Sequence, residues 1–92
     1  MGTSALAVDE RVKDVEVNAR VLRVKLMDGR AIEVPLSWYP RLKKASAKQR
    51  GKWQISAGGF GIHWPDVNED LSTAGLLRGA PAPGGKPSAA KR

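Results

Sequence analysis

The chain contains no cysteine, and it has only one histidine, one phenylalanine and one tyrosine in 92 residues. The absence of cysteine excludes disulfide bonds, thiolate metal sites and thiol nucleophiles, and it fits a reducing compartment. No apolar run is long enough to cross a membrane, and no secretory signal opens the sequence. We therefore expect a soluble protein of the cytoplasm with no membrane partner.

The motifs of common enzyme classes are also missing. The sequence has no Walker loop, no dinucleotide fingerprint and no His-Glu-x-x-His helix. Its glycine-rich run at 58–61 precedes an alternating strand pattern, whereas a phosphate-binding loop precedes a helix. Histidine is the side chain that ordinarily changes charge near neutral pH, and His63 is the only one present. We expect no enzymatic activity and no bound cofactor.

The net charge of +7 is concentrated in the second half of the chain. Residues 1–40 balance acids against bases, and the tail adds bases at Lys86, Lys91 and Arg92. A basic cluster of this kind is typical of a nucleic-acid or acidic-protein contact, and a solvated helix face gives the same pattern. The cluster, called the basic block below, spans residues 41–52 and holds Arg41, Lys43, Lys44, Lys48, Arg50 and Lys52.

Strands are predicted in the first half of the chain. Residues 21–26 alternate between apolar and charged side chains, which indicates a strand with one buried face. Asp28-Gly29 follows and predicts a two-residue hairpin turn that leads into a partner strand over residues 30–35. An imperfect alternation over residues 12–17 predicts a further strand. Pro35 lacks an N–H, so its strand ends there or lies at an edge.

Two short helices are predicted next. Ser37 is expected to cap the first, whose apolar stripe consists of Tyr39, Leu42 and Ala45 and which has Pro40 in its first turn. The sequence Ser-Ala-Lys-Gln at 46–49 is a capping box, and it predicts a second helix that ends near residue 51.

The remainder predicts a hairpin and a last helix. Residues 53–56 and 60–64 have the strand pattern, and Gly58-Gly59 supplies the turn between them. Pro65 stops the second strand, and residues 66–70 read as a loop. Ser72 is expected to cap a helix closed by Gly79.

The predicted fold class is α+β, with a small antiparallel sheet made of a meander and a hairpin and packed with short helices. Residues 9–79 are expected to form a single domain. Residues 1–8 are expected to be flexible, and the Pro/Gly/Ala-rich basic tail 80–92 is expected to be disordered because it cannot bury enough apolar surface.

Several sequence blocks occur together in an order that is typical of one family. The Met-Asp-Gly hairpin is followed by a Trp-Tyr-Pro-Arg-Leu block, an Ile-His-Trp-Pro block with trailing acids, and a Leu-Leu-Arg-Gly end. Together they resemble the small bacterial family of domain of unknown function 2442, over roughly residues 11–79. The residues that carry the resemblance include Asp28, Gly29, Tyr39, Pro40, Leu42, His63, Trp64, Pro65, Glu69 and Asp70.

The resemblance implies a small α+β fold of bacterial or phage origin and no established activity. In some members of that family the domain is joined to a helix-turn-helix or is encoded beside small toxin-like proteins.

His63 has a structural and a functional interpretation. On a strand it faces opposite to its neighbours Ile62 and Trp64. We expect a structural histidine that bonds to the segment 66–70. A metal site with Asp66, Glu69 and Asp70 is the alternative, although one imidazole with carboxylates is a weak set for zinc.

The aromatic residues and Arg41 also have two interpretations each. Trp38, Tyr39, Trp53 and Trp64 serve either as the core or as a platform for stacked bases, and Trp38 is the expected exception to a core role. Arg41 is expected to pair with Glu69 or Asp70, with a phosphate contact as the alternative.

We interpret the chain as a non-catalytic adaptor that acts through a protein partner in a toxin–antitoxin-like or transcriptional setting. The alternative is direct nucleic-acid binding through the basic block and the basic tail. Trp38 and the six basic side chains of residues 41–52 are the candidate contacts in either case. Partner identity and oligomeric state do not follow from the sequence.

Overall fold

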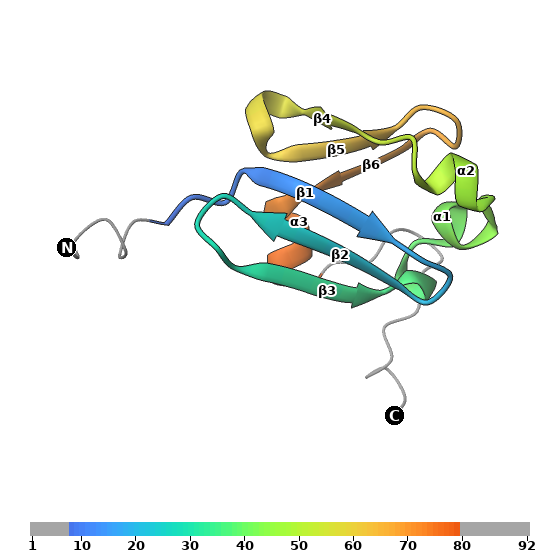
Figure 1. The fold of residues 1–92 in the computed structure, drawn as a ribbon, viewed down its shortest axis with the longest axis horizontal. Helices are drawn as coiled ribbons and strands as arrows, with labels where there is room; N and C mark the ends of the chain where they lie inside the picture. The colour runs from blue at the N-terminus through green and yellow to red at the C-terminus, as the bar shows by residue number, and fades with distance from the viewer. Residues whose placement is uncertain (1–7, 80–92) are drawn as a thin grey trace.

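The computed structural model describes residues 8–79, which form two three-stranded antiparallel sheets and three short α-helices (Figure 1). The α+β class is confirmed. The elements are β1 (Val12–Val17), β2 (Val21–Leu26), β3 (Ala31–Pro35), the 3-10 turn η2 (Leu36–Trp38), α1 (Pro40–Lys44), α2 (Ala47–Arg50), β4 (Gln54–Ser56), the 3-10 turn η3 (Ala57–Gly59), β5 (Gly61–Trp64), β6 (Glu69–Ser72) and α3 (Thr73–Arg78).

The predictions for the two termini fall largely outside this range. Residues 1–7 and the tail 80–92 lie outside the described residues. None of the helices among residues 8–79 is long and apolar enough to cross a membrane.

The first sheet has the strand order β1-β2-β3 and follows the sequence pattern closely. Leu22, Val24 and Leu26 of β2 are fully buried on one face. In β1 the register shifts between Val12 and Asp14, which inserts an extra residue opposite β2. This bulge explains the imperfect alternation, because the insertion returns the next apolar side chain to the buried face.

The hairpin between β2 and β3 differs in detail from the two-residue turn that was predicted. The Leu26 N–H donates to Arg30 O at 2.8 Å, and the Gly29 N–H donates to Leu26 O at 3.1 Å. The loop therefore has three residues, a turn followed by Gly29 at a φ of +99°. Three-residue loops place glycine in this way because the last loop residue needs a positive φ.

The helix caps are confirmed at two of three predicted positions. Ser46 and Gln49 form the complete capping box of α2. Ser72 accepts from the Gly75 N–H at the start of α3, which ends at Gly79 with a φ of +78°. The prediction for Ser37 was wrong: it lies inside η2, and α1 begins after Tyr39 without a side-chain cap. A turn of 3-10 helix leads into α1 instead.

The second sheet has the order β4-β5-β6 and contains a strand that the sequence did not predict. Residues 69–72 were assigned to a loop and a helix cap, but they form β6, in which Trp64 pairs with Glu69 and Ile62 with Leu71. The assignment failed because a strand that opens with two acids gains its stability from pairing with β5. The predicted single sheet is also corrected, since the strands form two separate ladders.

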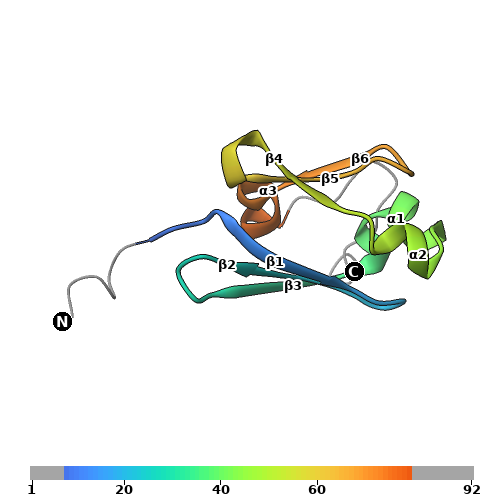
Figure 2. The same cartoon turned by 45° about the horizontal axis from the view of Figure 1, so that its top comes forward.

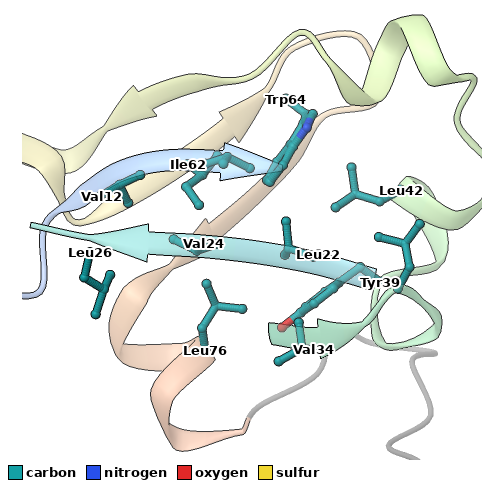
Figure 3. Close-up of a cluster of buried hydrophobic side chains, with 12 residues drawn as sticks. Val12, Leu22, Val24, Leu26, Val34, Tyr39, Leu42, Ile62, Trp64 and Leu76 are labelled. Carbon is teal, nitrogen blue, oxygen red and sulfur yellow. The ribbon is translucent and has the colours of Figure 1, made fainter. Parts of the chain in front are cut away.

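The two sheets lie as layers, with α3 between them near one end and α1 and α2 at the other (Figure 2). Side chains of both sheets and of the helices meet in one core (Figure 3). Trp64 and Ile62 contribute from β5, Leu22 from β2 and Leu76 from α3. The expected stripe of α1 is confirmed, since Tyr39, Leu42 and Ala45 are buried.

Candidate functional site

The basic block lies on α1, α2 and the segment that leads into β4, at one end of the molecule (Figure 1). Six basic side chains in so short a segment would form a strong positive surface if all of them pointed into solvent. Most of them bind other parts of the fold instead.

Arg41 and Lys43 hold α1 to two loops. The Arg41 Nη1 donates to Asn68 O in the β5–β6 loop at 2.6 Å. The Lys43 Nζ donates to Ala19 O between β1 and β2 at 3.0 Å. Arg41 thus reaches the region expected of it but binds the main chain, and residues 8–79 contain no ion pair between Arg41 and Glu69 or Asp70.

Arg50 and Lys52 are also used internally. The Arg50 guanidinium donates to Leu42 O and to Lys43 O, both at 3.0 Å, and so satisfies carbonyl groups at the end of α1. Lys52 pairs with Asp66 at 3.6 Å. Only Lys44 and Lys48 of the block make no hydrogen bond or ion pair to a described residue, and both are exposed. Among residues 8–79, the block therefore has two basic side chains, Lys44 and Lys48, that no hydrogen bond or ion pair holds in place.

The aromatic residues divide between the core and its rim. Tyr39 and Trp64 are fully buried, and the Trp64 indole N–H donates to Arg50 O at 3.0 Å. Trp38 and Trp53 are partly buried and pack against the core. The Trp38 ring lies 6.4 Å from that of Tyr39, and its buried indole N–H has no hydrogen-bond partner among residues 8–79. Trp38 is less exposed than its sequence position indicated.

His63 lies on the outer face of the second sheet, in a cross-strand row with Gln54 and Asp70. Its Nδ1 lies 2.8 Å from an Asp70 carboxylate oxygen. The predicted hydrogen bond to the segment 66–70 is therefore present. Among residues 8–79, no hydroxyl group is hydrogen-bonded to this imidazole, so the pair lacks the nucleophile that a hydrolytic site would need.

The metal alternative conflicts with the geometry of β6. Glu69 and Asp70 are consecutive residues of one strand, so their side chains point to opposite faces of the sheet. Glu69 is buried with Trp64, whereas Asp70 is exposed and lies on the same face as the partly buried His63. No group of three or more His, Asp or Glu side chains within residues 8–79 is placed to hold a metal ion.

Buried Glu69 sets the electrostatics of the core next to the block. Its side chain is only slightly accessible, and this burial raises the pKa of the Glu69 carboxyl, an effect that the nearby Arg41 charge partly offsets. Burial also raises the pKa of Tyr39 to about 12, with a further contribution from the Glu69 charge. The carboxylate thus acts inside the fold rather than on its surface.

Asp28 and Gly29, the other part of the sequence signature, hold the β2–β3 loop. One Asp28 carboxylate oxygen accepts from the Asp9 N–H at 3.0 Å, and the other accepts from the Arg30 N–H at 3.1 Å. The Arg30 guanidinium adds an ion pair at 2.9 Å. Hydrogen bonds from Arg30 and from the main chain lower the pKa of Asp28 to about 2. These residues act in folding.

The residues singled out in the sequence therefore fall into two groups. Most of the signature residues build the fold, and the exposed side chains include Lys44 and Lys48 on the block and the apolar Ile55 and Phe60 in the hairpin that follows it. The exposed edge around Ile55 was not predicted from the sequence. The turn-forming residues 65–68, which follow directly on the strand pattern of residues 60–64, were the signal that could have revealed β6 and, with it, which strands lie at the edges.

The fold and its site define a small α+β domain of two layered antiparallel sheets. Comparison with protein families matches the chain to "Protein of unknown function (DUF2442)" over residues 12–82. The chain belongs to this family. The resemblance drawn from the sequence blocks is thereby confirmed.

Two solved structures share the fold. A crystal structure of a protein of unknown function from Rhodospirillum rubrum has a TM-score of 0.68 and 27% sequence identity, covering 78% of this chain and 89% of that chain. A solution NMR structure of an uncharacterized protein from Chromobacterium violaceum has a TM-score of 0.67 and 23% identity, covering 78% and 68% respectively. No curated protein matches the chain.

Proposed function

We propose that this protein is a non-catalytic cytoplasmic adaptor that binds a protein partner, in a regulatory setting such as toxin control or transcription. The proposal rests on one observation, which is that most side chains of the basic block bind other parts of the fold. Arg41, Lys43 and Arg50 donate to main-chain carbonyls, and Lys52 pairs with Asp66. These contacts hold the side chains against the fold, so fewer of them are free to turn toward a phosphate backbone.

The hairpin that follows the block adds exposed apolar side chains. Lys44 and Lys48 are exposed on the block, whereas Ile55 and Phe60 have exposed fractions of 46% and 48% in a hairpin that runs away from α2 (Figure 1). Exposed apolar side chains are a common feature of surfaces that bind other proteins.

Nucleic-acid binding is the second candidate, favoured by the net charge of +7. If Lys44 and Lys48 each contact one phosphate, the salt dependence of the DNA affinity can be predicted. Each phosphate contact contributes a slope of about 0.9 to the dependence of log affinity on log salt, so two contacts reduce the affinity about tenfold between about 50 and 200 mM salt.

A titration of labelled duplex DNA separates the two candidates. We compare the full chain with a variant carrying Lys44→Glu and Lys48→Glu, and measure fluorescence anisotropy across the salt range. A matched control carries Lys13→Glu and Arg20→Glu, two exposed bases whose side chains form no hydrogen bond or ion pair within residues 8–79. Both variants have the same net charge.

For the adaptor we expect weak, sequence-independent binding that both variants reduce equally, because only net charge contributes. Sub-micromolar binding to a defined sequence at physiological salt, lost in the Lys44 and Lys48 variant but kept in the control, would make nucleic-acid binding the better assignment.

A further inference from the structure

The two sheets have four edge strands, and one of them differs from the rest. β1 carries Lys13, Asp14 and Glu16 and has a bulge, β3 carries Glu33 and ends in Pro35, and β6 opens with Glu69 and Asp70. Charges, proline and bulges are the features by which proteins prevent an edge strand from pairing with another chain. β4 has the sequence Gln-Ile-Ser and carries none of them.

The hydrogen-bond pattern of β5 shows which groups of β4 are open. The Thr73 N–H donates to Phe60 O on the β6 side of β5. Because hydrogen-bonded positions alternate along an antiparallel strand, Ile62 and Trp64 exchange bonds with β6, while Gly61 and His63 exchange bonds with β4. Gln54 and Ser56 are thus paired, and the N–H and C=O of Ile55 point away from the sheet.

The side chain of Ile55 is exposed at the same position. It lies on the face that Ile62 and Leu71 occupy in the neighbouring strands, yet 46% of its surface remains accessible. An added strand would cover this side chain and satisfy both main-chain groups of Ile55. An antiparallel strand suits these groups best, because one partner residue can exchange both hydrogen bonds with Ile55.

The charge beside β4 selects the partner. Lys48 lies on α2, and Lys52 comes two residues before the strand. Within residues 8–79, Lys52 pairs with Asp66 and with no other acid, and the Lys52 side chain is about half exposed, at 53%. An acidic segment therefore gains favourable electrostatic interactions at this end of the strand, whereas a second copy of a chain with net charge +7 is repelled.

We propose that the open edge of β4 binds an extended acidic segment of a partner protein, which adds an antiparallel strand beside Ile55. This inference rests on the adaptor function proposed above and names its docking edge and the chemistry of its partner.

The test uses the isotope-labelled full chain and a synthetic peptide of alternating glutamate and valine with blocked ends. A peptide of alternating lysine and valine is the control. With the acidic peptide we expect saturable NMR shifts at the amides of 54–56, and hydrogen exchange of the Ile55 amide slowed about tenfold at saturation, because its N–H becomes bonded. The basic peptide should give neither.

A pair of variants isolates the main-chain contact. Ile55→Pro removes an N–H that makes no bond inside the sheet, so the protected amides of β5 should persist. Acidic-peptide binding should weaken at least about fivefold through the lost hydrogen bond. Ile55→Thr keeps both the N–H and β-branching, and should bind almost as the native chain does.

The proposal is overturned if the acidic peptide shifts amides of other edges but not β4, if both peptides bind equally, or if Ile55→Pro binds as the native chain does. Shifts at 54–56 that grow with protein concentration alone would assign the edge to a second copy instead. None of these results bears on the salt titration with Lys44 and Lys48, which tests the adaptor function itself.

Discussion

The two sheets are alike in strand number and orientation, but one carboxylate that belongs to each of them, Asp28 in the first and Glu69 in the second, lies in an opposite environment. In the first sheet, Asp28 lies in a hairpin loop and is saturated with donors from Asp9 and Arg30. In the second, Glu69 lies on the buried face beside Trp64. The pKa of Asp28 is lowered and the pKa of Glu69 is raised.

The difference shows how each sheet is specified. The first sheet depends on local features, an alternating strand and a loop closed by its own side chains. The second depends on distant segments, because α1, α2 and the β5–β6 loop meet around Trp64 and Glu69. Burying a carboxylate costs free energy, and the fold tolerates this cost only where tertiary packing fixes the position of the group.

The largest expected effect comes from the inner face of β5. We expect Trp64→Ala to destabilise the fold by about 3–5 kcal/mol, because it leaves a large cavity and removes the hydrogen bond to Arg50 O. Urea denaturation followed by circular dichroism measures the change. His63→Gln, one residue earlier on the outer face, is the control and should stay within about 0.5 kcal/mol. Equal losses for both would contradict the assignment of faces.

The loop of the first sheet should respond next most strongly. Gly29→Val is expected to cost about 1–3 kcal/mol through backbone strain alone, since the φ of +99° suits glycine and no atom lies within 4 Å of an added Cβ. The unfolding free energy of the variant measures this. Gly51→Ala, at an ordinary negative φ with 3.6 Å of clearance, should be nearly neutral. A neutral Gly29→Val would show that the loop is not strained.

The smallest effect is a pH dependence of opposite sign in the two sheets. The folded pKa of Asp28 is about 2, below its ordinary 3.8, so its stabilisation is present above pH 3.8 and is lost as the pH falls toward 2. The folded pKa of Glu69 is raised above 4.5, so its destabilisation is present at neutral pH and disappears as the pH falls through the raised pKa toward 4.5.

Asp28→Asn and Glu69→Gln separate these contributions. As the pH falls, the free energy of unfolding of the native chain should approach that of Asp28→Asn from above, and it should increase relative to that of Glu69→Gln. Urea titrations over the acidic range measure both differences. If both stability differences change in the same direction with pH, the environment assigned to Asp28 or to Glu69 is wrong.

Much of the first sheet could be predicted because its signals are local. The alternation over residues 21–26 and the glycine of the loop are sufficient to predict a hairpin. The length of its loop depended on which two residues form the last hydrogen-bonded pair before the turn, and these are Leu26 and Arg30. The capping box at Ser46 and Gln49 was equally clear, since both of its bonds are made within one turn. Ser37 has the composition of a cap, but the chain around it forms η2.

The second sheet and the candidate site were harder to predict. β6 opens with Glu69 and Asp70, and such a segment becomes a strand only through pairing with β5. The basic block had the composition of a phosphate-binding surface, but the carbonyl partners of Arg41 and Lys43 lie in loops more than twenty positions away in the chain. The hydrogen bond of His63 to Asp70 was predictable because the segment 66–70 follows His63 within a few positions.

The sequence by itself determined the first hairpin and the caps of two helices, because each depends on residues that lie within a few positions of one another. It also determined the α+β class and the family, because the order of such local patterns along the chain is visible without the fold. Only the tertiary structure decided which basic side chains remain available, where Glu69 is buried and which strand edge is open. Those properties depend on contacts between distant segments, and local composition does not specify such contacts.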